Sequence, residues 1–341
     1  MREDFFKTSK LPSEKSQIET IYFGGGTPSM LETRELLRAL DQVFEVFEVV
    51  ANPEITIEAN PDDLTLSKLL ELKATPFNRL SIGIQSFHQT DLFYLNRIHS
   101  SGQAREVLDN CLEVGFENLT VDLIFGIPTL SDEMWLENLD RVIERKTPHI
   151  SVYGLTVEPK TPLELFVRKG KAKPVDEEQY ARQFEIMVDR LEAAGYEHYE
   201  ISNFALPGRQ GRHNTSYWTG KPYLGLGPSA HSFKGNQRWW SPPNTSKYIY
   251  SIQSHALPLE TETLSSDNAY NEYIMTSLRT SKGCNLEVIR DRWGESQLQV
   301  FLNKLKVYTN QGCFAINAEN VTLSKKGKLL ADRITAELFV G

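Results

Sequence analysis

The stretch Thr20–Pro28 (TIYFGGGTP) decides the fold, because an apolar run enters three glycines and then a proline. Glycines lack a Cβ atom and let the backbone approach a ligand closely, and Pro28 fixes the exit toward a helical pattern. Phosphate cradles and tight barrel turns share such a run, so alone it is weakly specific. The run becomes informative because similar strand ends recur along the first half of the chain.

Apolar, β-branched runs alternate with helical patterns through this half. The runs predicted as strands are Thr20–Phe23, Ile55–Ala59, Leu80–Ile84, Leu119–Phe125 and Ile150–Leu155. The segments predicted as helices between them are Arg34–Phe47, Leu66–Leu72, Ala104–Val114 and Trp135–Glu144. This alternation predicts βαβ units and a parallel, barrel-type sheet. A Rossmann sheet is the competing architecture, but no G-x-G-x-x-G opens a helix after the first strand.

Polar side chains stand where these strands end. In barrel-like α/β folds the carboxyl ends of the strands carry the chemistry. The residues at these ends are Thr27, Glu58, Gln85, Asp122 and Ser151. Glu58 is able to accept hydrogen bonds from ribose hydroxyls. The alternative is a cap for the helix that follows, although Asp62 and Asp63 are better placed for capping. Asp122 is flanked by apolar residues and needs a partner, since an unpaired buried carboxylate is costly. Arg97 is expected on a helix.

The segment Ile201–Leu259 contains no Asp or Glu, in a chain with a formal net charge of −8. It carries nine aromatic residues, and its cations are Arg209, Arg212, Lys221, Lys234, Arg238 and Lys247. Such a segment suits a flat apolar ligand with anionic edges, such as a porphyrin or a nucleobase with phosphates. The alternative is an irregular region whose aromatic residues are plain core and whose cations are solvated.

The overall composition is that of a globular protein, with 40% hydrophobic and 24% charged residues. No apolar run approaches the ~20 residues that span a bilayer. The acidic balance argues against nucleic-acid binding. The three cysteines are far apart and odd in number, which predicts buried free thiols in the cytoplasm.

The last part of the chain predicts helices followed by a small hairpin, which resembles a winged-helix module with a docking or lid role. Helices are expected at Asn268–Arg279, Asn285–Trp293, Ser296–Leu305 and Lys325–Leu338, and the hairpin joins Cys313–Ile316 to Val321–Leu323. The expected organisation is therefore a partial barrel over residues 1–200, the acid-free segment over 201–259 and a helical domain over 260–341.

Six motifs in order resemble the radical S-adenosylmethionine (SAM) branch that contains oxygen-independent coproporphyrinogen III oxidase. They are Gly24–Pro28 (GGGTP), Ile57–Pro61 (IEANP), Gly83–Phe87 (GIQSF), Leu95–His99 (LNRIH), Asp122–Pro128 (DLIFGIP) and Ser151–Leu155 (SVYGL). The resemblance implies an α/β fold with a partial β/α barrel and a small C-terminal domain. It also implies a set of residues around SAM, namely Gly25, Gly26, Thr27, Glu58, Gln85, Arg97, Asp122, Thr156 and His231.

Within that branch, the acid-free segment resembles the heme chaperone subfamily. The motif H-N-x-x-Y-W begins at His213, and G-x-G-P-S-A-H-S begins at Gly225. The resemblance implies a protein that binds heme and delivers it to respiratory enzymes, with His213 as the iron ligand. The other residues implied on the heme side are Asn214, Tyr217 and Trp218, with Arg209, Arg212 or Lys221 near the propionates. For a lone histidine the ordinary alternative is a polar loop residue, and His231 is the second candidate for the ligand.

The chain departs from the family pattern at its start. Family members carry a C-x-x-x-C-x-x-C loop that holds a [4Fe–4S] cluster, and no such motif occurs in these 341 residues. As written, the chain is expected to perform no radical SAM catalysis. Either the start is shortened or the protein is a natural cluster-less relative, and the persistence of the SAM-side residues favours a shortened start.

Three hypotheses follow. The first is a heme chaperone, the second a radical SAM enzyme acting on a porphyrin, and the third an inert barrel with an interaction role. The expected partners are heme and heme-accepting respiratory proteins, with no nucleic acid; peripheral membrane association and a homodimer are left open.

Overall fold

The computed structural model describes residues 17–256, 259–317 and 319–341. Residues 1–16 of the expected barrel domain, 257–258 of the acid-free segment and 318 of the C-terminal domain lie outside the described residues. The chain divides into two compact units, one that ends at His213 and one that begins at Asn214.

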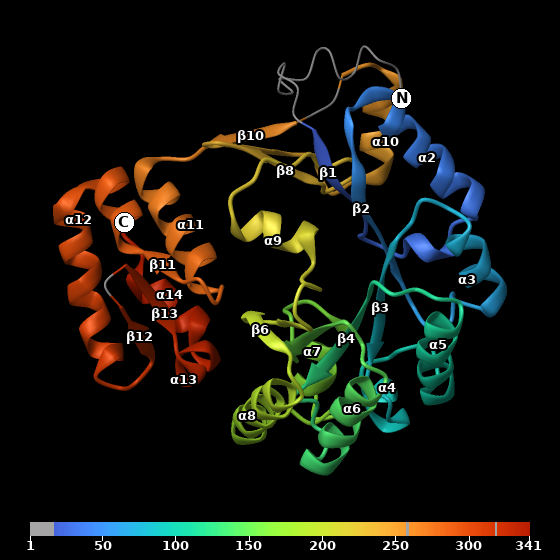
Figure 1. The fold of residues 1–341 in the computed structure, drawn as a ribbon, viewed down its shortest axis with the longest axis horizontal. Coiled ribbons are helices and arrows are strands. Elements are labelled where there is room, and N and C mark those ends of the chain that lie inside the picture. The colour runs from blue at the N-terminus through green and yellow to red at the C-terminus, as the bar shows by residue number, and fades with distance from the viewer. Residues whose placement is uncertain (1–16, 257–258, 318) are drawn as a thin grey trace. The chain divides into compact units, whose positions relative to one another are not determined.

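The first unit is built on a curled sheet of seven strands in the order β1-β2-β3-β4-β5-β7-β6 (Figure 1). The strands are β1 Ile18–Phe23, β2 Val49–Ala59, β3 Arg79–Gln85, β4 Leu119–Phe125, β5 His149–Gly154, β6 Glu197–Glu200 and β7 Asn203–Ala205. Strands β1 to β5 pair in parallel and in chain order, and β7 pairs antiparallel to both β5 and β6. A parallel sheet that runs in chain order from its first strand is the start of a β/α barrel.

Helices follow most of these strands and lie along one side of the sheet (Figure 1). They are η1 Pro28–Met30, α2 Thr33–Val46, α3 Leu66–Lys73, α4 Gln89–Tyr94, α5 Ser101–Glu113, α6 Asp132–Glu144, α7 Pro162–Arg168 and α8 Glu177–Ala193. Several begin at a side chain that accepts the backbone N–H three residues on, as Thr65, Ser100, Ser131 and Asp176 do. Such caps satisfy donors that the first turn of a helix leaves open. Helix α9, Arg212–Trp218, contains the division between the two units.

The two faces of the sheet differ in polarity because side chains alternate along a strand. On β2, Ile55 and Ile57 are almost fully buried in the apolar core. Glu54, Thr56 and Glu58 alternate with them and point to the other face. We call this second side the polar face, and it carries Glu58 and Asp122 among the predicted site residues.

The second unit holds two small antiparallel sheets and five helices within its described residues. One sheet has the order β10-β9-β8, with β8 His231–Lys234, β9 Gln237–Trp240 and β10 Glu260–Thr263. The other has the order β11-β13-β12, with β11 Cys284–Asn285, β12 Phe314–Ile316 and β13 Asn320–Leu323. The helices are α10 Thr245–Gln253, α11 Ser266–Leu278, α12 Leu286–Thr309, α13 Lys325–Leu329 and α14 Ala331–Leu338.

The predicted fold class is confirmed, and the expected strands and helices occur close to their predicted positions. The two helices expected at Asn285–Trp293 and Ser296–Leu305 are confirmed as the two parts of α12, which breaks at Gly294, where the φ of 88° is non-helical. The single helix expected over Lys325–Leu338 is wrong in detail, because the chain breaks at Leu330 between α13 and α14. The short helices α4 and α7 were not predicted, since each spans too few residues to show a clear period. In the described part of the chain, no helix has the length and apolar character needed to cross a membrane.

Candidate functional site

The carboxyl ends of β1 and β2 are joined through Glu58. Its Oε1 accepts a hydrogen bond of 2.7 Å from the Tyr22 hydroxyl, and its Oε2 accepts one of 3.0 Å from the Gly25 N–H. Gly24 lies so close that a Cβ atom there would stand 2.6 Å from the Tyr22 ring and 2.9 Å from the Glu58 carboxylate. Gly25 and Gly26 have φ values of 74° and 70°, which glycine adopts readily. The glycine run is therefore folded onto Glu58.

Glu58 does not cap a helix, so that alternative is wrong. Thr65 caps α3 by accepting a hydrogen bond of 3.2 Å from the Lys68 N–H. The expectation that Asp62 or Asp63 would cap this helix is also wrong. Asp63 instead accepts a hydrogen bond of 2.7 Å from the Ser29 hydroxyl.

Asp122 is half-buried on β4, and Ser151, Ser81 and Arg79 supply the hydrogen bonds and the opposite charge that a buried carboxylate needs. Burial raises its pKa to about 7, and the nearby charge of Glu58 adds to this rise. Side-chain hydrogen bonds from Ser151 and Ser81 and the charge of Arg79 act in the opposite direction. The register places these groups together, because Asp122 is paired with Ser151 on β5, and Ser81 with Glu58 on β2. Two carboxylates thus share one region of the polar face.

Three other residues of the predicted SAM set lie on loops or strand ends of the same unit. Gln85 ends β3 with a φ of 66°. Thr156 is exposed just after β5. Arg97 is not on a helix as expected, because α4 ends at Tyr94 and Asn96 takes a φ of 54°. Burial lowers the pKa of Arg97, while the charges of Asp122 and Asp62 raise it. The predicted residues of this unit therefore gather at one edge of the sheet, and their role toward SAM stays a prediction.

His213 lies at the start of α9 and contacts β1. Its ring stacks on Tyr22 with centroids 4.7 Å apart, and its Nδ1 lies 2.8 Å from the Thr20 hydroxyl. Burial lowers the pKa of His213, and the charge of Glu54 partly opposes this. A lowered pKa keeps the imidazole neutral near pH 7, which is the form that binds metals.

The backbone at the start of α9 is held by a buried carboxylate on β2. Glu54 accepts hydrogen bonds from the backbone N–H groups of Arg212 and His213, at 3.2 and 2.9 Å. Arg79 of β3 approaches the same carboxylate at 3.9 Å. Neither Glu54 nor Arg79 was singled out from the sequence. The available signal was the alternation of polar and apolar residues along β2, whereas Glu58 was predicted from its place at the strand end.

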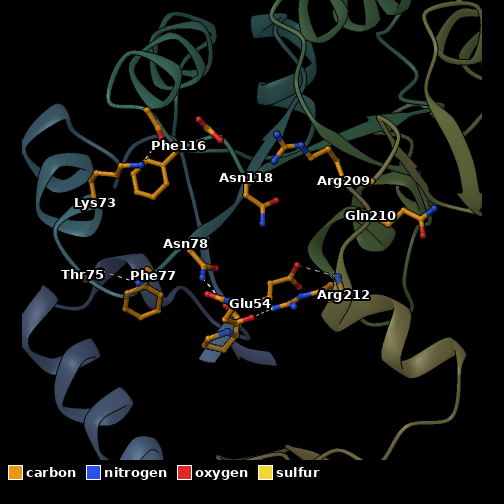
Figure 2. A pocket seen from close by; sticks show the side chains of 15 residues that line it. Glu54, Lys73, Thr75, Phe77, Asn78, Phe116, Asn118, Arg209, Gln210 and Arg212 are labelled. Atoms are coloured by element: carbon orange, nitrogen blue, oxygen red, sulfur yellow. Dashed lines mark hydrogen bonds between the residues drawn. The ribbon is translucent and has the colours of Figure 1, made fainter. Parts of the chain in front are cut away.

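A pocket of about 600 Å³ lies at the opposite, amino ends of β2, β3 and β4, and is shown in Figure 2. Lys73, Arg209 and Arg212 line it together with Glu54. The Arg212 guanidinium donates a hydrogen bond of 2.9 Å to the Asn52 carbonyl. Two of the cations expected near heme propionates, Arg209 and Arg212, are thus brought together here, whereas Lys221 belongs to the second unit.

The remaining predicted heme-side residues lie in the second unit. Tyr217 packs edge-on against Tyr223, with centroids 4.7 Å apart. The guanidinium of Arg279 lies 5.1 Å from the centre of the Trp218 ring. The buried Trp218 Nε1 has no hydrogen-bond partner among the residues that the structure describes. These contacts leave the roles of Asn214, Tyr217 and Trp218 toward heme as predictions.

His231 also belongs to the second unit, where its exposed ring stacks on Trp240 at 5.5 Å. No contact of this ring tests its expected place beside SAM, which therefore stays a prediction.

The side chains present do not suit a [4Fe–4S] cluster. Cys111, Cys284 and Cys313 are each buried and unbridged, on α5, on β11 and just before β12. Burial raises the pKa of the Cys111 thiol to about 12, which disfavours the thiolate that metals bind. In the described ranges, no three His, Cys, Asp or Glu side chains are grouped to hold a metal ion.

Comparison with known proteins agrees with this architecture. Residues 3–142 match the Radical SAM superfamily, and residues 264–330 match the HemN C-terminal domain. The heme chaperone HemW of Bacillus subtilis is 32% identical over 319 residues, which cover 93% of this chain and 84% of that protein. HemW of Mycobacterium tuberculosis is 32% identical over 323 residues, which cover 94% of this chain and 81% of that protein. The chain belongs to the HemW family.

A solved structure extends the HemW comparison to the fold. Coproporphyrinogen III oxidase (HemN) from Escherichia coli, described as a radical SAM enzyme, superposes with a TM-score of 0.80. The match covers 95% of this chain and 78% of that chain at 23% sequence identity. At this identity the likeness concerns the fold alone. The family resemblance predicted from the sequence motifs is confirmed.

Proposed function

We propose that this chain is a heme chaperone that binds heme through His213 and passes it to acceptor proteins. The observation that carries the proposal is the setting of His213, whose ring is stacked on Tyr22 and bonded to Thr20 through Nδ1. Relatives at 32% identity over most of the chain are named heme chaperones, which supports the same cargo here.

The contacts of the ring suit an axial ligand. When Nδ1 carries the proton and donates it to the Thr20 hydroxyl, the lone pair resides on Nε2, and Nε2 is the nitrogen that would bind iron. In metal-binding histidines, a hydrogen bond donated by the other ring nitrogen fixes the orientation of the ring and raises the basicity of the ligating nitrogen. Ligation through Nε2 would leave both the Thr20 bond and the Tyr22 stack in place. Asn214, Tyr217 and Trp218 remain the other proposed heme-side residues.

The acceptors in this proposal are heme-requiring respiratory proteins, and the compartment is the cytoplasm. Three buried, unbridged cysteines support a reducing compartment. Peripheral association with a membrane and formation of a homodimer remain open parts of the proposal, because respiratory acceptors are commonly membrane-bound.

A second candidate is a radical SAM enzyme that acts on a porphyrin. The structural likeness to HemN and the polar edge around Glu58 and Asp122 favour it. Against it stands the donor set, because these 341 residues offer no cysteine triad for the cluster. No radical step is therefore assigned to this chain. The inert barrel with an interaction role is the third candidate, and it would be preferred if the chain bound neither heme nor SAM.

Titration of the full chain with ferric heme, followed by absorbance, tests the proposal. We expect a Soret band typical of a histidine-ligated heme, which is lost or shifted in His213→Ala with affinity at least tenfold weaker. Cys111→Ala is the control, since this fully buried thiol should leave the spectrum unchanged. An unaltered spectrum and affinity in His213→Ala would refute the assignment, and loss of the band in His231→Ala would move the ligand there.

Transfer is tested separately from binding. The heme-loaded chain is mixed with a heme-free respiratory acceptor, and the gain of acceptor absorbance is compared with that from free heme. Binding without transfer would support a heme-binding protein and contradict the chaperone role.

A further inference from the structure

We infer that Glu54 is the positioning residue of the site: it anchors the start of α9 to the sheet and so fixes where His213 stands. The meaning of this inference for heme rests on the proposed function. Its structural basis lies wholly within the first unit and is independent of any ligand.

The anchor joins residues that are about 160 positions apart in the chain. Oε1 of Glu54 accepts the His213 N–H at 2.9 Å, and Oε2 accepts the Arg212 N–H at 3.2 Å. One carboxylate thus receives two consecutive backbone donors at the start of α9. Charge-assisted hydrogen bonds of this kind are stronger than neutral ones. The backbone of His213 is therefore fixed by β2.

Glu54 is itself held in place by β3. Its side chain is 5% exposed, as is that of Arg79, which lies 3.9 Å away. Arg79 donates hydrogen bonds of 2.5 Å to Asn118 and 2.6 Å to Thr120. A buried carboxylate of this kind is stable only when it is paired and hydrogen-bonded. Arg79 supplies the opposite charge, and the Arg212 and His213 amides supply the hydrogen bonds.

The approach of α9 also depends on Gly211. A Cβ atom at Gly211 would lie 3.3 Å from the Arg79 guanidinium, so the absence of a side chain allows the backbone to pass close by. The segment from Gly211 to His213 thus docks on the polar face, and the ring of His213 continues to Thr20 and Tyr22 on β1. Thr20 and Tyr22 contact the ring, and Glu54 holds the backbone at Arg212 and His213.

Glu54 and Glu58 bind different parts of the chain, although Glu58 lies only four residues along the same strand and on the same face. Glu58 holds the Tyr22 hydroxyl and the Gly25 backbone at the other end of the strand. The two carboxylates therefore organise separate features, the glycine run and the start of α9.

The variant Glu54→Gln tests the anchor with the smallest change in shape. One carboxylate oxygen becomes an NH₂ group, which cannot accept a backbone N–H. We expect hydrogen–deuterium exchange at the Arg212 and His213 amides to rise at least tenfold in the full chain without any ligand. Asp91→Asn is the matched control, because Asp91 is also fully buried and accepts two side-chain hydrogen bonds, but from Ser86 and Thr129. Unchanged exchange at the two amides in Glu54→Gln would overturn the inference.

Heme binding supplies the second readout, as a double-variant cycle with His213→Ala. A residue that acts through His213 should weaken heme binding by about tenfold in the parent chain and have no further effect once His213 is removed. Equal, additive effects in both backgrounds would show that Glu54 acts only on general stability and would overturn the inference.

The two readouts separate this inference from the proposed function. If His213→Ala bound heme as tightly as the parent, the proposed function would fail, and amide exchange alone would decide whether Glu54 anchors α9. If Glu54→Gln did not fold, Glu54→Asp would replace it. That variant keeps the charge opposite Arg79 but is one methylene shorter, so at least one of the two amides should lose protection.

Discussion

The replacement Asp122→Asn should stabilise the protein, and the gain should grow as pH rises. Asparagine resembles the protonated form of the aspartate and keeps an acceptor for the serine hydroxyls. Burial raises the pKa of Asp122 from 3.8 to about 7, so the folded chain holds the proton more tightly than the unfolded chain does. For such a group the stability contribution is fully present below pH 3.8 and is lost as pH rises through about 7.

The size of the effect follows from the two pKa values. A rise from 3.8 to about 7 corresponds to about 4 kcal/mol in the free energy of unfolding, since one pKa unit is about 1.4 kcal/mol. This value is an upper bound, because the NH₂ group of the asparagine is a new donor that needs its own hydrogen-bond acceptor in this place. We therefore expect Asp122→Asn to unfold at nearly the same urea concentration as the parent at pH 4, and to be more stable by between about 1 and 4 kcal/mol at pH 8.

Urea unfolding followed by circular dichroism at pH 4, 6 and 8 measures this difference. Taking the difference between variant and parent at each pH removes the contribution of all other groups. Asp41→Asn, at an exposed position on α2, is the control for the loss of one carboxylate from the surface of the chain. A difference for Asp122→Asn that is flat from pH 4 to 8, or that becomes less favourable as pH rises, would refute the electrostatic argument.

Two further predictions concern the glycine run and SAM. Gly24→Ala should lower the free energy of unfolding by roughly 1–3 kcal/mol, and with it the melting temperature, because its Cβ would overlap the Tyr22 ring and the Glu58 carboxylate. Gly102→Ala is the control, because a Cβ there would stand an ordinary 3.7 Å from its nearest neighbour. It should leave the melting temperature unchanged or raise it. SAM should bind this chain weakly, with a dissociation constant above micromolar by titration calorimetry, because the sequence supplies no cysteines for the cluster that would anchor its methionine end; a micromolar or tighter complex would contradict this.

Local patterns in the sequence were enough to predict the sheet. Strand β4, Leu119–Phe125, has the predicted bounds, because a short β-branched run closed by glycine leaves few alternatives. The same locality explains the error at Arg97. Asn96 takes a left-handed conformation just after α4 ends, and asparagine is one of the residues that adopt it at helix ends, so the stop signal stood next to Arg97 and was not used.

The site was predicted only in part, because its contacts join residues that are far apart in the chain. Glu58 and Asp122 were found from their places at strand ends. Glu54 was not, since nothing near it in the chain indicates that its partners are the backbone amides of residues 212 and 213. A side chain that binds backbone N–H groups leaves no mark on the identity of the residues it holds. A single sequence therefore does not reveal contacts of this kind between a side chain and a distant backbone.

Strand β1 connects the two predicted ligand regions physically. The Tyr22 ring stacks on His213, while its hydroxyl donates to Glu58, which in turn accepts the Gly25 N–H. Burial and the charge of Glu58 raise the pKa of Tyr22 well above its usual value, so the phenol stays protonated and the donor persists at every physiological pH. A single neutral side chain thus lies between the histidine proposed for heme and the glycine run predicted for SAM. Because interiors are close-packed, a displacement of Tyr22 at one of these contacts must be felt at the other. The glycine run and His213 therefore form one packed unit, even though 185 residues of chain lie between Thr27 and His213.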